Sequence, residues 1–123
     1  MSDTYDNKVR SDSNATADRI IATLPDFSRK FFNSIRLTKS PRTRAQCAYD
    51  MQRFFTWLFN QAGFKDTNRI TVQAKDIFDV LTPDDIQEYI SYLSVSKDGK
   101  VRSMQFIARN LATLKSFINH YIL

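Results

Sequence analysis

Two stretches of this 123-residue chain concentrate side chains suited to recognising an anion. Arginine and glutamine can reach the edges of nucleic-acid bases, while lysine, serine and threonine commonly contact phosphates. Each stretch begins a helical pattern. A helix amino terminus already carries positive partial charge, so additional cations there favour an anionic partner. The candidate binding residues are Lys39, Arg42, Thr43, Arg44 and Gln46 in the first stretch, and Lys97, Lys100, Arg102, Ser103, Gln105, Arg109 and Lys115 in the second.

The supply of nucleophiles and metal ligands argues against an enzyme. His120 is the only histidine and Cys47 is the only cysteine, so a His/Cys metal cluster cannot be assembled. The chain has two glycines, and they lie too far apart to form a glycine-rich phosphate loop. Asp84, Asp85 and Glu88 fit an acidic helix start better than a catalytic pair. We therefore expect no catalytic residue, no metal and no cofactor.

Length and composition favour a single all-α domain. Ten Phe and five Tyr, with only two Gly and three Pro, are typical of a helical bundle with a bulky aromatic core. No stretch approaches the ~18 consecutive apolar residues of a membrane span, and residues 1–14 do not form a signal peptide. The lone Cys47 fits a reducing compartment, so we expect a cytoplasmic protein that does not contact membranes.

Charge is segregated along the chain. Residues 1–28 carry a net charge of −2 and residues 29–69 a net charge of +7. Residues 70–94 return to −4, and residues 95–123 carry +4. If the two basic segments are neighbours in space, the molecule has a basic face and an acidic face, and the basic face would attract a polyanion.

Apolar spacing and capping signals predict four main helices, at residues 26–36, 42–62, 83–94 and 101–122. Asp26 is the expected cap of the first helix, and Ser40 caps the second, which Gly63 would end. The run from Thr82 to Asp85 is a strong start for the third helix. The apolar stripe expected to enter the core from the last helix is Val101, Met104, Ile107, Ala108, Leu111, Leu114, Ile118, Tyr121 and Ile122.

Two segments are less regular. Residues 1–23 are predicted to be a polar, flexible tail, within which Thr16 to Leu24 could form a short helix or a docked arm. Residues 65–81 could be a loop with one or two helical turns, because a strand there would have no partner strand.

Several short motifs follow one another along residues 24–123. They are Leu24-Pro25-Asp26-Phe27, Ser40-Pro41-Arg42-Thr43, Tyr49-Asp50-Met51, Phe54-Phe55, Trp57-Leu58, Leu81-Thr82-Pro83-Asp84-Asp85-Ile86, Tyr89-Ile90 and the run from Ala108 to Phe117. In its order and spacing, this series resembles the amino-terminal core-binding domain of tyrosine recombinases and phage integrases.

The resemblance implies a SAM-like bundle of four main helices that clamps double-stranded DNA opposite a separate catalytic domain. In that family the helices matching 42–62 and 101–122 approach the DNA. The matching positions at the start of the first are Arg42, Thr43 and Arg44, and those on the second are Lys100, Arg102, Ser103, Gln105 and Arg109. The chain departs from the family at Cys47, where an aromatic residue, usually Tyr, is common.

The family's tyrosine nucleophile and its Arg, Lys and His-x-x-Arg partners belong to a carboxy-terminal catalytic domain. The resemblance therefore predicts that the native gene continues into such a domain, which would carry out DNA integration or recombination with other recombinase protomers. Residues 24–123 would bind DNA without cutting it. The alternative is a helical protein-interaction module whose basic face binds an acidic partner. Arg109 could also pair with Asp50 or Asp85 and serve only to tie helices together.

Overall fold

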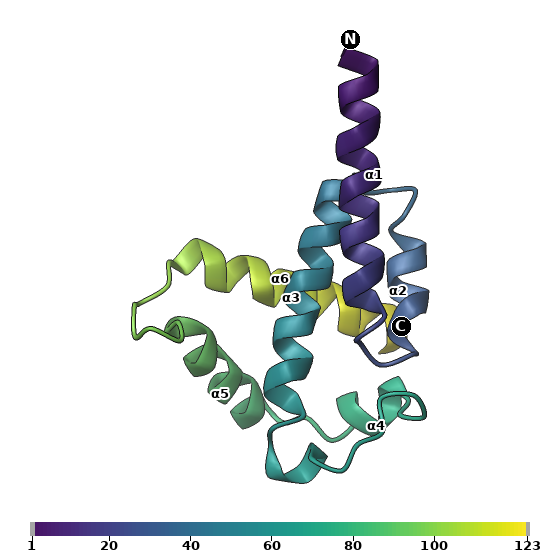
Figure 1. Cartoon of the computed structure of the whole chain (residues 1–123). Coiled ribbons are helices and arrows are strands. Elements are labelled where there is room, and N and C mark those ends of the chain that lie inside the picture. Colours follow the sequence, from purple (N-terminus) through teal and green to yellow (C-terminus); the bar gives the residue numbers. More distant parts are fainter. Residues whose placement is uncertain (1, 123) are drawn as a thin grey trace.

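The computed structural model describes residues 2–122, and within this range the chain is all-α, as its composition predicts. Six α-helices are present there, and four of them overlap the four main helices expected. Figure 1 shows α3 running through the middle of the bundle, with α1 and α2 on one side, α5 on the other and α6 crossing it. The elements are α1 (Ser2–Ile21), α2 (Ser28–Ser34), α3 (Pro41–Leu58), the 3-10 helix η1 (Ala62–Phe64), α4 (Ala74–Phe78), α5 (Pro83–Ser94) and α6 (Met104–Ile122).

Helix α1 corrects the expectation of a flexible tail at residues 1–23. Residues 2–21 form one helix, and residue 1 lies outside the described residues. The carboxy-terminal end of α1 is docked, because Ala17, Ile20 and Ile21 are buried and α1 packs mainly against α3. Their helical spacing places these apolar side chains on one face, whose burial holds the segment in place. The amino-terminal half extends beyond the bundle (Figure 1).

Helix α2 is shorter than the predicted 26–36, and Asp26 does not cap it. The cap position falls on Phe27, which has a helical backbone conformation and no side-chain capping bond. The Asp26 carboxylate lies 3.9 Å from Arg29 and 3.8 Å from Arg69 instead. Asp26 also donates its backbone N–H to the Arg69 carbonyl oxygen at 2.9 Å, so it joins α2 to a distant loop.

Helix α3 begins where the sequence predicts and ends four residues earlier than residue 62. The Ser40 hydroxyl accepts the Thr43 N–H at 3.1 Å, which confirms Ser40 as the cap. The end at Leu58 has a local cause. The side-chain amide of Asn60 donates to the Thr56 carbonyl oxygen at 2.8 Å, and that of Gln61 donates to the Trp57 carbonyl oxygen at 3.1 Å. The backbone N–H groups of Asn60 and Gln61 also bond to the Trp57 and Leu58 carbonyl oxygens, at 3.2 and 2.9 Å. The last carbonyls of α3 are therefore satisfied before Gly63, which lies in η1 and is not the stop.

Residues 65–81, expected to form a loop with one or two helical turns, consist of turns and the short helix α4. The Asp76 carboxylate accepts the Gln73 N–H at 2.9 Å and fixes the start of α4. Val72, Ile77 and Phe78 are buried, and α4 packs against α6. The segment therefore closes one end of the core.

Helices α5 and α6 are joined by a tight hairpin. Helix α5 has the predicted bounds, and Thr82 and Asp85 form a reciprocal capping box at 3.2 and 2.9 Å. After α5, Arg102 donates its backbone N–H to the Ser94 carbonyl oxygen at 2.8 Å, and Gly99 turns the chain with φ of +83°. This hairpin delays the start of α6 to Met104, three residues after the predicted start.

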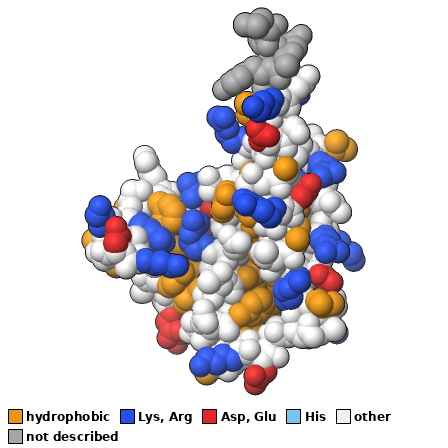
Figure 2. All heavy atoms as spheres, in the orientation of Figure 1, with side chains coloured by type: hydrophobic (Ala, Val, Ile, Leu, Met, Phe, Trp, Pro, Cys, Tyr) orange, Lys and Arg blue, Asp and Glu red, His pale blue; other side chains and the backbone are white. Residues whose placement is uncertain are grey.

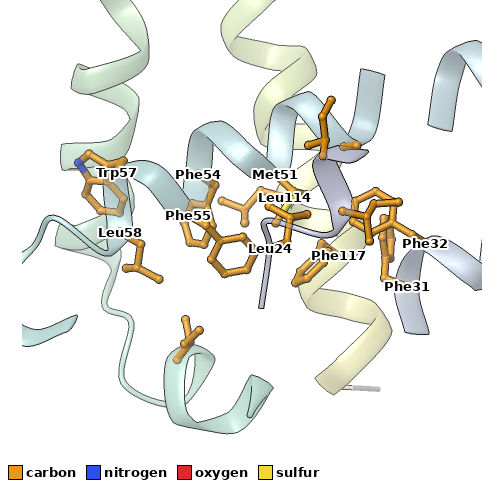
Figure 3. Close-up of a cluster of buried hydrophobic side chains, with 14 of the residues drawn as sticks. Leu24, Phe31, Phe32, Met51, Phe54, Phe55, Trp57, Leu58, Leu114 and Phe117 are labelled. Carbon is orange, nitrogen blue, oxygen red and sulfur yellow. The ribbon is translucent and has the colours of Figure 1, made fainter. Parts of the chain in front are cut away.

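The core is largely aromatic, and Figure 3 shows its buried side chains coming from α2, α3 and α6. Phe117 is fully buried, and its ring centroid lies 5.0 Å from Phe31, 5.8 Å from Phe55 and 5.9 Å from Phe78. Edge-to-face and tilted pairs of this kind stabilise a core beyond the area they bury. Phe117 does not belong to the predicted stripe of α6.

The predicted stripe of α6 is only partly correct. Ile107 and Leu114 are buried as expected. Val101 and Met104 are 83% and 78% exposed, because both precede the part of α6 that contacts the bundle. Among residues 2–122, no helix combines the length and the apolar character needed to cross a membrane.

Candidate nucleic-acid interface

A buried carboxylate organises the crossing of α3 and α6. The Asp50 side chain is 1% exposed. It accepts the Thr113 hydroxyl at 2.8 Å, an Arg109 N–H at 3.2 Å and an Arg53 N–H at 3.4 Å. The Gln46 amide adds a fourth donor at 3.3 Å. A buried charge is tolerated only when it is paired and hydrogen-bonded, so this network fixes the position of both arginines.

Asn110 extends the network along α6. It is 2% exposed, and its side-chain amide donates to the Phe106 carbonyl oxygen at 2.8 Å. Its oxygen accepts an Arg53 N–H at 2.8 Å. Arg53 of α3 is therefore held by two residues that are themselves held inside the fold.

Three guanidinium groups surround one aromatic ring beside this network. Arg102, Arg53 and Arg109 place their central carbons 4.7, 4.8 and 5.2 Å from the centroid of Phe106. Attraction to the ring face and the charge of Asp50 together hold the three cations close to one another. Among the side chains that the structure describes, Asp50 is the one carboxylate that bonds to this group, so positive charge remains in excess there. The Arg109 side chain is still 43% exposed.

Further cations extend this region in both directions. Arg42, Tyr49 and Arg53 recur at spacings of seven and four residues, which places them on one side of α3. Figure 2 shows Lys and Arg side chains gathered over the α5–α6 loop and the adjoining helices, with hydrophobic side chains between them. We call the cationic set the basic face, and its members are Lys39, Arg42, Arg53, Lys97, Lys100, Arg102 and Arg109.

A groove opens beside the arginine cluster. It has a volume of about 480 Å³ and lies between α3, α5 and the α5–α6 loop. Tyr49 of α3 and Tyr92 of α5 line it, together with Arg53, Lys97 and Arg102. The region therefore combines cations with exposed aromatic rings, a combination typical of nucleic-acid-binding surfaces.

The chain matches no protein-family model, no curated protein and no solved structure. The function must therefore be inferred from the site itself.

Arg44 is buried and therefore does not belong to the candidate interface. It is 3% exposed, and its guanidinium pairs with Asp18 of α1 at 3.1 Å and donates to the Phe32 carbonyl oxygen at 3.2 Å. The sequence placed Arg44 at a DNA-facing helix start, but α1 covers that side of α3. Arg44 instead ties α1, α2 and α3 together.

Three other predicted residues are engaged within the fold. Thr43 exchanges hydrogen bonds with Ser40 at the start of α3. Ser103 accepts the Phe106 N–H at 3.1 Å and so caps α6. Gln46 is half-buried and donates to Asp50. These side chains position the helices that carry the basic face.

Gln105 and Lys115 are exposed on α6. Lys115 lines a separate apolar hollow with Ile86 and Leu111. It stands six residues after Arg109, which places the two side chains on different sides of α6. Lys115 therefore does not join the basic face.

Sequence reasoning missed Arg53, Phe106 and the two groove tyrosines. A signal was available, because Phe106 stands four residues after Arg102 and three before Arg109. Such pairs meet on a helix surface. Arg53 had a weaker signal, since only its contacts with α6 separate it from an ordinary solvated arginine.

Cys47, the position at which the chain departs from the recombinase pattern, is half-buried beside the network. Burial raises the pKa of its thiol, the Thr113 hydroxyl opposes that rise, and the charge of Asp50 adds to it. The thiol therefore stays protonated at neutral pH. Among the side chains that the structure describes, within residues 7–122, no group of three His, Cys, Asp or Glu residues is placed to hold a metal ion.

Proposed function

We propose that this chain binds double-stranded DNA through its basic face. The observation that carries the proposal is the convergence of Arg53, Arg102 and Arg109 on Phe106, with two of these arginines fixed by the buried Asp50. Fixed guanidinium groups lose little conformational entropy on binding, and their planar donors suit phosphates and guanine edges.

The dimensions of the face support a duplex as the partner. Arg42 and Arg53 are eleven residues apart on α3, which corresponds to about 16 Å along the helix axis. One strand of B-form DNA presents a phosphate about every 3.4 Å of axis, so this length spans about five phosphates. Cations on α6 and on the α5–α6 loop widen the surface beyond a single line.

We further propose that the domain is a SAM-like core-binding domain of a tyrosine recombinase, which would hold DNA for integration or recombination by a catalytic domain. The motif series of residues 24–123 supports this, as does the origin of the basic face. The face is built from α3, the α5–α6 loop and α6. Helices α3 and α6 match the segments that approach DNA in that family. The proposal assigns no catalytic role to residues 2–122.

Salt dependence of duplex binding tests the proposal. If the face neutralises about five phosphates, the log–log plot of the association constant against salt concentration should have a slope of roughly −4.5. The variant Arg102→Ala should reduce that slope by about one. Lys115→Ala removes the same charge from a side chain off the face and should leave the slope unchanged. Fluorescence anisotropy with a labelled duplex measures all three proteins.

Two results would contradict duplex binding. The first is no binding even at low salt, with the fold verified by circular dichroism. The second is displacement of the labelled duplex by polyglutamate as effectively as by unlabelled duplex of equal charge. That outcome would favour the alternative, an interaction module for an acidic protein.

A further inference from the structure

The groove beside the basic face is lined by two aromatic rings as well as by cations, and contacts to phosphates alone would not require the rings. Tyr49 and Tyr92 line it from two different helices, and each is 39% exposed. Its volume of about 480 Å³ falls within the range of about 300–1,000 Å³ typical of small-molecule sites. It is therefore large enough for a planar group between or against these rings.

One face of the Tyr92 ring packs against the core. Its ring stacks on Tyr89, with centroids 6.0 Å apart and an angle of 20° between the ring planes. Tyr89 is fully buried and packs against Phe54 at 5.2 Å and Trp57 at 5.1 Å. The exposed part of Tyr92 is thus a fixed aromatic surface, and a flat ligand would lose little affinity in ordering it.

The polar side chains of the groove suit a nucleotide. Arg53 and Arg102 belong both to the groove and to the arginine cluster, and Lys97 adds a third cation at the rim. Gln52 supplies an amide that can both donate and accept hydrogen bonds. Aromatic rings that stack on a base, next to cations that follow the backbone, form the usual platform for an unpaired strand.

One carboxylate also lines the groove. Asp98 accepts the Ser96 hydroxyl and lies 3.9 Å from the Lys100 ammonium group, which offsets its repulsion of a phosphate. The hydrogen bond from Ser96 lowers the pKa of Asp98. A charged carboxylate can accept a hydrogen bond from the amino group of a base.

We propose that this groove binds one unpaired nucleotide of a DNA strand that continues from the duplex on the basic face. The inference rests on the proposed function, because Arg53 and Arg102 join the two surfaces. The base stacks on Tyr92, with Tyr49 as the second ring, while Arg53 and Lys97 contact the flanking phosphates. The domain thus distinguishes a duplex that carries an unpaired nucleotide from a continuous one.

The test compares three labelled DNAs with the same duplex sequence: a blunt duplex, the duplex with a short single-stranded extension, and the same extension with abasic sites. We expect the extended duplex to bind at least about fivefold more tightly than the blunt one, the lower limit for stacking one base. The abasic extension keeps its phosphates and should lose that gain. Tyr92→Ala should also lose it, and Tyr92→Phe should keep it. Leu37→Ala, at a side chain that is 96% exposed outside the groove, is the matched control.

Each outcome decides between the proposals. If the blunt duplex binds but the extension adds nothing, or the abasic extension binds equally well, the nucleotide site is wrong and duplex binding stands. If no DNA binds, the proposed function itself fails. Should deoxynucleoside monophosphate at micromolar concentration abolish the gain, the groove is a site for free nucleotides, and the assignment to a strand is overturned. Circular dichroism checks whether Tyr92→Ala folds. If it does not, Tyr49→Ala removes the second ring of the groove and should also lose the gain in affinity from the extension.

Discussion

At the scale of the residue, Asp50 determines what the arginines at the helix crossing can do. Its carboxylate is buried and accepts hydrogen bonds from Arg53 and Arg109. One buried negative charge therefore pairs with two positive charges that lie nearer the surface. The net positive charge stays at the surface, and its location is fixed by a residue that cannot itself touch a ligand. Arg109 therefore pairs with Asp50, one of the two acids considered as its structural partners, while its exposed part remains available for binding.

Replacing Asp50 with Asn tests this arrangement. Asp50→Asn keeps the shape of the side chain and removes the charge that holds two arginines. Hydrogen bonds to charged groups contribute about 1.5–3 kcal/mol each, so we expect the free energy of unfolding to fall by about 2–4 kcal/mol in urea denaturation. Asp66→Asn, at an exposed carboxylate, is the control and should change stability by less than about 0.5 kcal/mol. An equal effect of both substitutions would show that Asp50 does not organise the crossing.

At the scale of the element, α1 differs most from expectation, because its polar composition conceals a docking surface. Ala17, Ile20 and Ile21 are buried against the bundle, and Arg44 and Asp18 join α1 to α3. This docking decides which cations of α3 remain available, since α1 covers Arg44 and leaves Arg42 exposed.

The docking of α1 predicts a strong contrast between its two halves. Ile20→Ala removes a side chain that is 3% exposed and should lower the free energy of unfolding by about 2–4 kcal/mol. Val9→Ala truncates an apolar side chain in the extending half and should have a much smaller effect. Thermal and urea unfolding measure both. A small loss at Ile20 would mean that α1 contributes little to the fold.

At the scale of the whole molecule, the last helix, α6, is hydrogen-bonded to α2, which lies far from it in the sequence. The Tyr121 hydroxyl donates to the Phe27 carbonyl oxygen at 2.6 Å and accepts the Phe31 N–H at 3.2 Å. Burial raises the pKa of Tyr121 to about 12, above its ordinary value of 10.0. The protonated phenol is thus the form that links α6 to α2.

This linkage predicts a loss of stability in strong base. Because the pKa of Tyr121 is higher in the folded than in the unfolded protein, its contribution is fully present below pH 10 and disappears as the pH rises towards 12. We expect the free energy of unfolding to fall over this range, and Tyr121→Phe to show a shallower fall. Urea denaturation at a series of pH values compares them. Parallel curves for the two proteins would contradict the assigned role of Tyr121.

The amino-acid sequence by itself determined the local features of this protein. The all-α class, the start of α3 at Ser40 and both bounds of α5 follow from capping residues and helical periodicity, which act within a few residues. The segregation of charge that predicts a basic face is also a property of the sequence. These features need no knowledge of distant contacts.

Only the tertiary structure decided which cations remain at the surface and which aromatic rings accompany them. Arg44 and Arg53 are both arginines of α3, yet one is buried beneath α1 and the other lies over Phe106 of α6. Phe117 reaches the centre of the core because α2, α3 and α4 all surround it. Burial and pairing depend on neighbours far apart in the chain, and periodicity along one helix does not contain that information.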